Sequence, residues 1–192
     1  MKKQIKVTLI VIVAAIIAAA IIWYVMYLRG KEQDLLTPVG TRAEFIGDTD
    51  KYPTMLTAKG TQILNADGEQ VVLKGVMVPE SRSLYEEKKF NEDFYKDVFA
   101  KGGNAIRVPI SPVEYKNDDY YMWRYLDRIV TWAGENDNYV ILDWDYTGNP
   151  IDGSGDEMPD LDENPLDYSA EFWKNIADYF KNTPNVIFEI YN

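Results

Sequence analysis

The 192-residue sequence predicts an α/β fold built on a parallel β-sheet, and three observations support this prediction. From Val71 onward, short apolar runs alternate with segments whose apolar residues recur at helical spacing. The apolar runs lack a regular polar alternation, which is typical of strands covered on both faces. One strand and one helix take about 38 residues, so eight repeats would need roughly 300, a normal size for a (β/α)8 barrel. We therefore predict about four βα units, the N-terminal half of a (β/α)8 TIM barrel, with a doubly wound open sheet as the alternative.

The first thirty residues predict a membrane segment instead of a part of this fold. Residues 7–28 carry no charge and are almost wholly apolar, and a helix of this length would span roughly 33 Å, enough for a bilayer core. The lysines in residues 1–6 favour a cytoplasmic N-terminus. We predict a single-pass anchor in the cell membrane with the remainder outside the cell. The alternative is a signal peptide cleaved near Ala18–Ala20, which would leave a secreted protein.

The rest of the chain divides into a linker and one globular domain. Residues 29–53 contain Pro, Gly and charge without a clear period, and residues 54–192 form the predicted domain. A β-hairpin is expected near its start, because two apolar-alternating runs flank the turn signal Asn65-Ala66-Asp67-Gly68. Ser169 is the expected N-cap of the last helix. The strands are expected at residues 71–79, 104–110, 139–146 and 186–192, and the helices at residues 90–101, 120–134 and 169–180.

Composition excludes several classes of site. The sequence contains neither cysteine nor histidine, which rules out disulfides, thiolate nucleophiles, His-ligated zinc and a Ser-His triad. Residues 31–192 carry 16 basic and 31 acidic residues, a net charge of −15. This sign opposes binding to nucleic acid and favours neutral or cationic partners. Carboxylates, Lys, Tyr, Ser and Thr remain to carry chemistry, and no cofactor is implied.

The candidate site residues stand where the predicted strands end, because barrel chemistry sits at the C-terminal ends of the strands. Asp143 and Asp145 share one face of their strand by the period of two. Arg107 either holds a carboxylate in its ionised form or ties a strand to a loop. Trp144 is either a stacking platform for a sugar ring or a core side chain. The full set of strand-end candidates is Glu80, Arg107, Asp143, Trp144, Asp145 and Asn192.

A long acidic loop after the third strand raises the question of a metal. Its carboxylates could ligate calcium, but their spacing does not fit the EF-hand loop, and such runs are usually solvated. We therefore predict no metal site. The acidic residues concerned are Asp152, Asp156, Glu157, Asp160, Asp162 and Glu163.

Four segments, in order, resemble the N-terminal half of glycoside hydrolase family 5, whose members are cellulase-like (β/α)8 barrels. They read KGTQILNADGEQVVLKGV, GGNAIRVPI, YLDRIVTWAGENDNYVILDW and FWKNIADYFKNTPNVIFEIYN, and the likeness covers roughly residues 55–192. It implies that Arg107 borders the catalytic nucleophile and that Asn192 holds the 2-hydroxyl of the substrate. It places the acid/base Glu directly after Asn192 and the nucleophile on a later strand, so neither is expected within residues 1–192.

Two residues bear on what the resemblance implies. The third strand of the family usually ends Asp-Trp-His, but Asp145 stands here in place of the histidine. Glu189 lies three residues before Asn192, so the strand period predicts that the two side chains point to opposite faces, and we interpret Glu189 as structural. The expected function is retaining hydrolysis of β-1,4-glucan, or a related mannan or xyloglucan, by the whole protein. The alternative is a non-catalytic, membrane-tethered glycan-binding relative.

Overall fold

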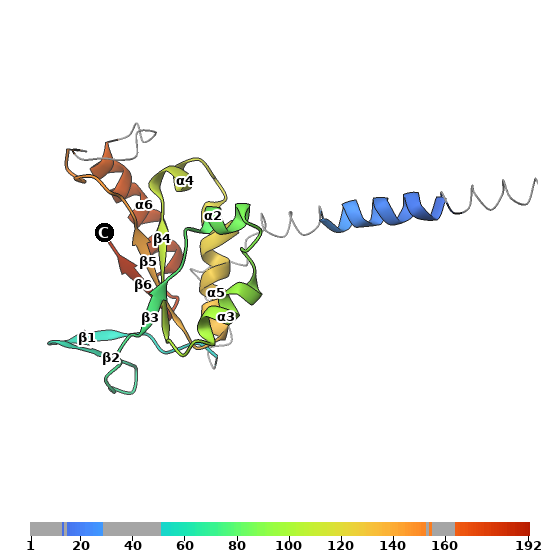
Figure 1. Cartoon of the computed structure of the whole chain (residues 1–192). Helices are drawn as coiled ribbons and strands as arrows, with labels where there is room; N and C mark the ends of the chain where they lie inside the picture. The colour runs from blue at the N-terminus through green and yellow to red at the C-terminus, as the bar shows by residue number, and fades with distance from the viewer. Residues whose placement is uncertain (1–12, 14, 29–50, 153, 155–163) are drawn as a thin grey trace, which may run out of the picture. The chain divides into compact units, whose positions relative to one another are not determined.

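The computed structural model describes residues 13, 15–28, 51–152, 154 and 164–192. The chain separates into two compact units, residues 1–37 and residues 38–192, which are described separately. In the first unit, residues 13 and 15–28 are helical (blue in Figure 1). Residues 1–12 and 14, and most of the predicted linker, lie outside the described residues. Across the described ranges, no helix has both the length and the apolar character needed to cross a membrane.

The second unit is built on a four-stranded parallel sheet whose order follows the chain, β3-β4-β5-β6 (Figure 1). Its register places Arg107 beside Met77 and Ile141, and Asp143 beside Glu189. A doubly wound sheet reverses its order at a switch point, and the described strands do not. The arrangement is therefore that of part of a (β/α)8 barrel. The strands are β3 (Gly75–Met77), β4 (Ala105–Ile110), β5 (Tyr139–Trp144) and β6 (Val186–Glu189).

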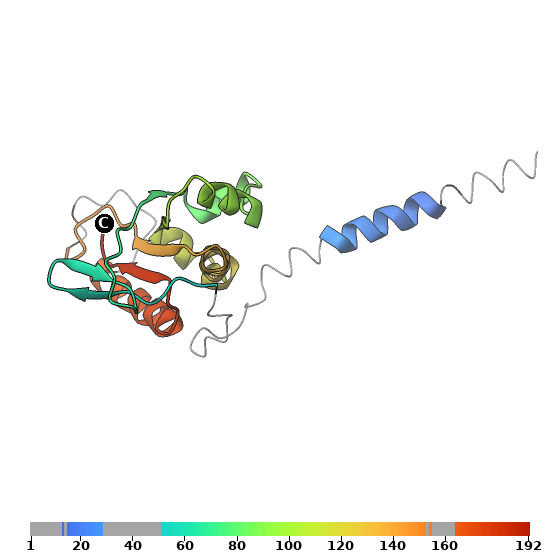
Figure 2. The ribbon, with the colours of Figure 1, turned by 90° about the horizontal axis from the view of Figure 1, so that it is seen from below.

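The helices lie along one side of the curved row of strands (Figure 2). The segments predicted from helical spacing are helical, and the short helices α2 and α4 were not predicted. Asn91 caps α3 by accepting a hydrogen bond from the Phe94 amide at 2.9 Å, and the chain turns away at Gly102, where φ is +89°. The helices are α2 (Ser81–Glu86), α3 (Glu92–Phe99), α4 (Pro112–Lys116), α5 (Asp127–Glu135) and α6 (Pro165–Phe180), with a π-helical turn η2 (Met122–Leu126) before α5.

The start of α6 corrects a prediction. Asn164 is the N-cap, because its side chain accepts hydrogen bonds from the amides of Leu166 and Asp167. Ser169 lies inside the helix, where its hydroxyl donates to the Leu166 carbonyl at 3.1 Å. A proline in the first turn of α6 suits a helix start, since its missing N–H would have no partner there.

The predicted hairpin turn forms, but the longer antiparallel pairing lies at another turn. Strands β1 (Thr57–Lys59) and β2 (Gln62–Leu64) pair antiparallel around Gly60, where φ is +62°. The turn at residues 65–68 supports a single bridge, between Leu64 and Gln70. Both turns contain a glycine with positive φ, so the turn signal alone did not decide which one carries the longer pairing.

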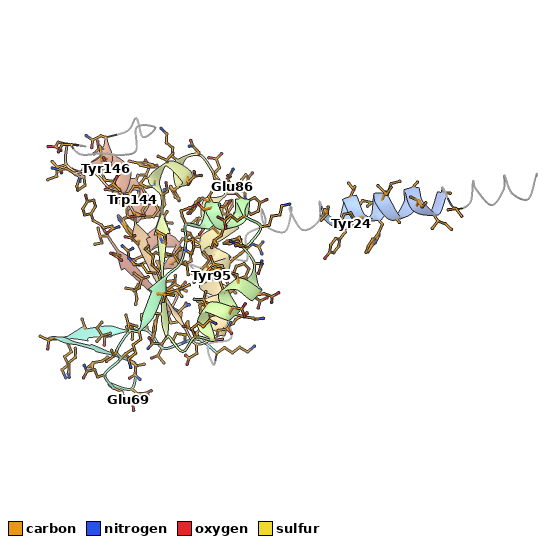
Figure 3. All side chains as sticks on the ribbon, in the orientation of Figure 1. Tyr24, Glu69, Glu86, Tyr95, Trp144 and Tyr146 are labelled. Atoms are coloured by element: carbon orange, nitrogen blue, oxygen red, sulfur yellow. The ribbon has the colours of Figure 1, made fainter. Side chains whose placement is uncertain are left out.

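Alternate residues of the strands build the core against the helices. Val108, Val140 and Leu142 are fully buried on this face, together with Phe172 and Ile176 of α6. The labelled rings of Tyr95 and Trp144 lie within the packed unit in Figure 3. Each fully buried apolar side chain of this kind contributes about 1.5–3 kcal/mol. The core therefore holds one face of the sheet rigid and leaves the other face for polar groups.

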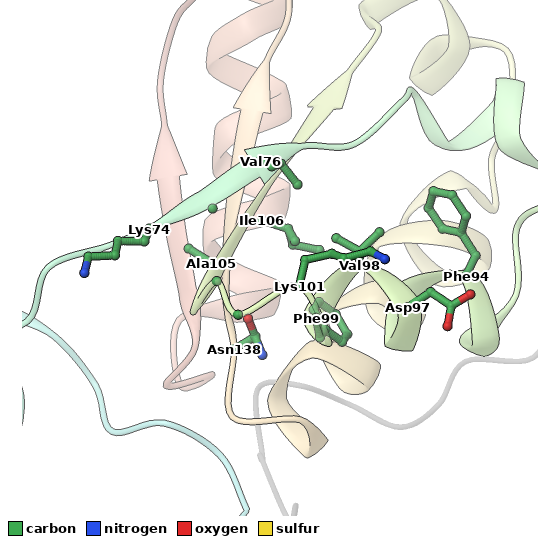
Figure 4. A pocket seen from close by; sticks show the side chains of 13 residues that line it. Lys74, Val76, Phe94, Asp97, Val98, Phe99, Lys101, Ala105, Ile106 and Asn138 are labelled. Carbon is green, nitrogen blue, oxygen red and sulfur yellow. The ribbon is translucent and has the colours of Figure 1, made fainter.

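A cavity of about 610 Å³ lies beside β3, but at the wrong end of the sheet for barrel chemistry. Its wall includes Val76, Val98 and Ile106, with Lys74 and Asn138 at the N-terminal ends of the strands (Figure 4). Active sites of such barrels form at the C-terminal ends. The active site is therefore expected at the C-terminal ends of the strands, where the predicted polar residues lie.

Candidate active site at the strand ends

Polar side chains gather at the C-terminal ends of β4, β5 and β6, on the face of the sheet away from the helices. The period of two places Asp143 and Asp145 on this face, while Leu142 and Trp144 point to the helices. Arg107 joins them from β4. The shared face predicted for the two aspartates is confirmed by their contacts, described below.

Arg107 is the centre of this cluster. Its Nε and Nη2 donate to the two carboxylate oxygens of Glu189 at 2.7 and 2.9 Å. Nη2 also lies 2.9 Å from Oδ2 of Asp143. This paired geometry joins β4 to β6 across β5, and such charge-assisted pairs are the strong ones. Arg107 thus ties strands together and holds a carboxylate ionised, which combines the two interpretations left open by the sequence.

Glu189 is the carboxylate that Arg107 holds most closely. The hydrogen bonds from Arg107 lower the pKa of Glu189, and the same contact raises the pKa of Arg107. Sequence analysis predicted a structural role for Glu189, and the ion pair with Arg107 supports that role. The pattern of the sequence did not indicate the pairing itself, since the two residues are 82 positions apart and on non-adjacent strands.

Asp143 is fully buried between these groups. Neither carboxylate oxygen has a hydrogen-bond partner within the described structure, although Arg107 lies close in ion-pair geometry. Burial raises the pKa of Asp143 from 3.8 to about 7, the Arg107 charge opposes this rise, and the charges of Glu189 and Asp145 add to it. Asp143 therefore changes charge near neutral pH.

We predict that the stability of the domain falls as pH rises from about 4 to about 7. Asp143 titrates at about 7 when folded and near 3.8 when unfolded, so the folded state binds more protons between these values. Its contribution is complete below the lower pKa and lost above the higher one. Urea unfolding near pH 5.5 and pH 8 measures the fall, and Asp143→Asn should flatten most of it. Asp178→Asn, on an exposed helix surface, should keep the slope; an equal slope in parent and Asp143→Asn would contradict the assignment.

Asp145 and Asn192 meet at the end of β5. Asn192 Nδ2 donates to Asp145 Oδ1 at 2.6 Å, so two of the residues predicted for substrate binding are in contact. Glu189 and Asn192 therefore face the same cluster, and the prediction that they point to opposite faces is wrong. The reason is that β6 ends at Glu189, so the period of two does not continue through residues 190–192.

The position of Trp144 decides between the two interpretations left open by the sequence. Its side chain is 1% exposed, and its ring packs on Phe172 with the ring centroids 4.2 Å apart and against Tyr168 at 5.5 Å. The ring lies on the helix side of β5, so it offers no face to a sugar. The core interpretation is right, and the stacking-platform interpretation is wrong, because Trp144 alternates with the inward-facing aspartates.

Glu80, another of the predicted strand-end candidates, does not belong to the candidate site. It caps α2 by accepting a hydrogen bond from the Ser83 amide at 3.0 Å, and the buried hydroxyl of Tyr121 donates to its other oxygen. Burial raises the pKa of Glu80, and the bond from Tyr121 opposes this rise. Glu80 therefore connects α2 to Tyr121 at the start of η2, and its described hydrogen bonds go to these elements instead of to the cluster around Arg107.

The acidic loop after β5 yields no metal site within the described residues. No group of three or more carboxylates there has the arrangement to hold a metal ion. Asp152 is described and exposed. The other acidic residues considered for calcium lie outside the described residues, namely Asp156, Glu157, Asp160, Asp162 and Glu163.

With this geometry established, comparison with known proteins assigns the family. Residues 64–192 match the family described as Cellulase (glycosyl hydrolase family 5). The chain belongs to glycosyl hydrolase family 5. The predicted resemblance is thereby confirmed, and the match includes β3 to β6 and every residue of the cluster.

Two curated proteins show what this chain is similar to. It is 28% identical over 158 residues to endoglucanase A of Butyrivibrio fibrisolvens and 25% identical over 191 residues to endoglucanase C of Evansella cellulosilytica. These matches cover 74% and 85% of this chain, but 32% and 22% of the relatives. The chain thus spans about a third or less of the length of these relatives.

A solved β-glucanase structure has the same fold over the matched part. The β-glucanase SdGluc5_26A from Saccharophagus degradans superposes with a TM-score of 0.67 at 25% identity, covering 76% of this chain and 44% of that one. The same β-glucanase has been solved in complex with cellotetraose. A cellulase, Cel5C_n, superposes with a TM-score of 0.57 at 22% identity and supports the fold alone.

Proposed function

We propose that the whole protein is a retaining glycoside hydrolase that cleaves β-1,4-linked glucan as an endoglucanase. The observation that carries the proposal is the polar cluster at the C-terminal ends of β4 to β6, within a chain of family 5. The relatives are endoglucanases and a β-glucanase, which supports a β-linked polysaccharide as substrate. The reaction would proceed by double displacement, with water as the final acceptor and no cofactor.

The described carboxylates of the cluster are poorly placed to act as the catalytic pair. Retaining hydrolysis needs two carboxyl groups about 5–5.5 Å apart that are free to reach the substrate. Glu189 is engaged by Arg107 on both oxygens, Asp143 is fully buried, and Asp145 accepts from Asn192. Following the resemblance to the family, we propose that the acid/base directly follows Asn192 in the whole protein and that the nucleophile lies on a later strand.

The cluster would then support the catalytic pair. Arg107 carries the only positive charge among its described members, so it would favour the ionised form of a nucleophile placed beside it. Asn192 would hydrogen-bond the 2-hydroxyl of the sugar, a contact that strengthens as the transition state forms. These roles of Arg107 and Asn192 are the ones that the resemblance to family 5 implies.

A non-catalytic glycan-binding protein is the second candidate. It is favoured by Asp145, which stands where the family usually has histidine, and by the absence of histidine from the whole sequence. An ionised aspartate cannot donate the hydrogen bond that an imidazole can. In this case the cluster would bind a β-glucan without cleaving it.

We also propose that the protein is exported and held at the cell membrane by residues 7–28. The uncharged apolar run and the preceding lysines support this location. Secretion after cleavage near Ala18–Ala20 is the alternative. An exported position would place the acidic domain where polysaccharides are found.

Reducing-sugar release from carboxymethylcellulose tests both activity and location. We expect the whole protein, expressed with the residues encoded after Asn192, to release sugar in the membrane fraction. Activity in the medium instead would indicate that the N-terminal apolar segment is cleaved off. The 192-residue chain should release none. Asn192→Ala in the whole protein should lower kcat/KM by about 100-fold, the loss of one transition-state contact of roughly 2.7 kcal/mol.

Three outcomes would each contradict a different part of the proposal. Release by residues 1–192 alone would show that the catalytic pair lies within them. A stop codon directly after Asn192, with binding but no cleavage of carboxymethylcellulose, would favour the binding protein. No release by the whole protein from any β-glucan or β-mannan would exclude the hydrolase.

A further inference from the structure

Another hollowed surface lies on the helix side of the sheet, between α6 and the segment that contains α4 and η2. It consists of two adjoining hollows of about 840 and 270 Å³, which share Tyr115 and Met122 as lining residues. The surface extends from Tyr168, near the start of α6, to Lys181, directly after the end of that helix. We call it the α6 groove. None of the described residues that line it belongs to the cluster around Arg107, so the groove is a separate surface of the domain.

Three half-buried tyrosine rings line the α6 groove, and each ring is held in place. The ring of Tyr115 packs edge-to-face on Phe172 with the ring centroids 4.8 Å apart. The Tyr168 hydroxyl donates to a backbone carbonyl of α4 at 3.4 Å, and the Tyr179 hydroxyl donates to Oδ1 of Asp127 at 3.3 Å. Rings that are already fixed lose little conformational freedom when a ligand packs on them. The groove therefore offers preorganised aromatic contact area.

The charges around the α6 groove cancel, although the domain as a whole is strongly acidic. Residues 31–192 carry a net charge of −15, whereas the groove is lined by equal numbers of cations and anions. The carboxylate of Asp118 lies 2.7 Å from Arg124, and that of Asp178 lies 2.8 Å from Lys181. This balance matches a neutral ligand and favours neither an anion nor a cation. The charged lining residues are Lys116, Lys174, Lys181, Asp118, Asp119 and Asp178.

One wall of the α6 groove includes the π-helical turn η2. The Asp127 amide bonds to the Met122 carbonyl five residues earlier, so the helix is locally widened at the residue that lines both hollows. Such turns are rare inside helices and are frequent at functional sites. The reaction proposed above gives this turn no role. Its position at the groove is therefore a second feature, besides the fixed rings, that sets this surface apart from an ordinary gap between helices.

We propose that the α6 groove is a second binding site for a β-linked glucan chain, outside the cluster at the strand ends. A sugar ring has apolar C–H faces that pack on fixed tyrosine rings, and its hydroxyls pair with the amide, carboxylate and ammonium groups of the rim. The choice of this polysaccharide rests on the proposed function. A second site would hold the whole protein on an insoluble polymer and raise the local concentration of chains at the strand-end site.

Titration of the full 192-residue chain with cellohexaose, followed by calorimetry, tests the α6 groove. We expect Tyr179→Ala to raise the Kd about tenfold, because one stacking ring is removed. Tyr179→Phe keeps the ring and should raise the Kd less than about threefold. Tyr85→Ala is the matched control, since it removes a half-buried tyrosine from α2, and it should leave the Kd unchanged.

Two further variants separate the groove from effects of folding and of the strand-end cluster. Ala177→Gln keeps the existing packing and places a longer neutral side chain in the groove, so it should also raise the Kd. In an Asn192→Ala background, which lacks the proposed sugar contact of the cluster, Tyr179→Ala should have the same effect as in the parent. Thermal unfolding of each variant shows whether folding has changed.

The whole protein distinguishes failure of the groove from failure of the proposed activity. Tyr179→Ala should lower the ratio of sugar release from insoluble cellulose to release from cellotetraose by about fivefold, and Tyr85→Ala should leave this ratio unchanged. Equal Kd values in the parent, Tyr179→Ala and Ala177→Gln, or no cellohexaose binding by any form, would overturn the groove proposal. Self-association of the parent that Tyr179→Ala abolishes, without glucan binding, would identify a second copy of the chain as the occupant and overturn it too. Groove binding without cleavage by the whole protein would support the groove and count against the hydrolase.

Discussion

Arg107→Ala is expected to lower the free energy of unfolding by about 2–4 kcal/mol at pH 7, because removing one partner from a fully buried ion pair costs about 3–5 kcal/mol and this pair is only partly buried. The substitution removes the cation that faces the buried Asp143 and both hydrogen bonds to Glu189. It also breaks the only side-chain link described between β4 and β6 through this cluster. Equilibrium unfolding in guanidinium chloride measures the effect as a lower midpoint at an unchanged slope.

Two further variants and a change of pH distinguish the loss of the paired hydrogen bonds from a simple loss of charge. Arg107→Lys keeps the charge but not the two parallel donors, so its loss should be intermediate. Arg82→Ala removes an exposed i,i+4 pair with Glu86 and should cost less than about 1 kcal/mol. The loss in Arg107→Ala should shrink near pH 5, where Asp143 carries a proton. An Arg107→Ala variant as stable as Arg82→Ala would show that the cluster does not hold the sheet together.

Trp144→Ala is the second large expected effect, a loss of about 3–5 kcal/mol in the free energy of unfolding. The indole is almost wholly buried on the helix side of β5, where it packs on Phe172 and Tyr168. Removing it leaves a cavity between the sheet and α6 that the surrounding side chains fill only in part. The same denaturant unfolding experiment provides the measurement.

Two further variants decide between the core and the sugar-binding roles of this tryptophan. Trp144→Phe keeps much of the buried ring area and should cost clearly less than the alanine variant. Tyr120→Ala removes an aromatic ring that is 44% exposed and should stay within about 0.5 kcal/mol of the parent. A Trp144→Ala protein of parental stability with weakened glycan binding would restore the stacking-platform interpretation.

Much of the architecture could be predicted because its signals are local. The helical spacing, the N-cap of α3 at Asn91 and the turn at Gly102 shortly after the helix act within a few residues of each other. The apolar runs that became β4 and β5 were long enough to indicate buried strands. Local signals failed where two of them competed, as at Gly60 and Gly68 in the hairpin, and at Asn164 and Ser169 for the start of α6.

In the candidate site, too, local patterns predicted some features correctly and missed others. The period of two correctly placed Asp143 and Asp145 on one face, because Asp145 directly follows β5 and its amide still bonds to the end of β4. It failed for Asn192, because β6 ends at Glu189 and the chain beyond it follows contacts with Trp173 and Gly148 instead. Those contacts join residues 17 and 43 positions apart. Local sequence patterns relate only residues that are close along the chain, so they cannot predict such contacts.

The sequence by itself determined the parallel α/β class, the family and the identity of the polar residues at the strand ends. These depend on side-chain type and short spacing, which act through local backbone preference and the burial of apolar runs. Only the tertiary structure decided how the residues pair: Arg107 with Glu189 and Asp143, Asn192 with Asp145, and Trp144 with α6. The physical reason is that charge, burial and hydrogen bonding depend on distances in space, and folding brings strands together that lie far apart along the chain.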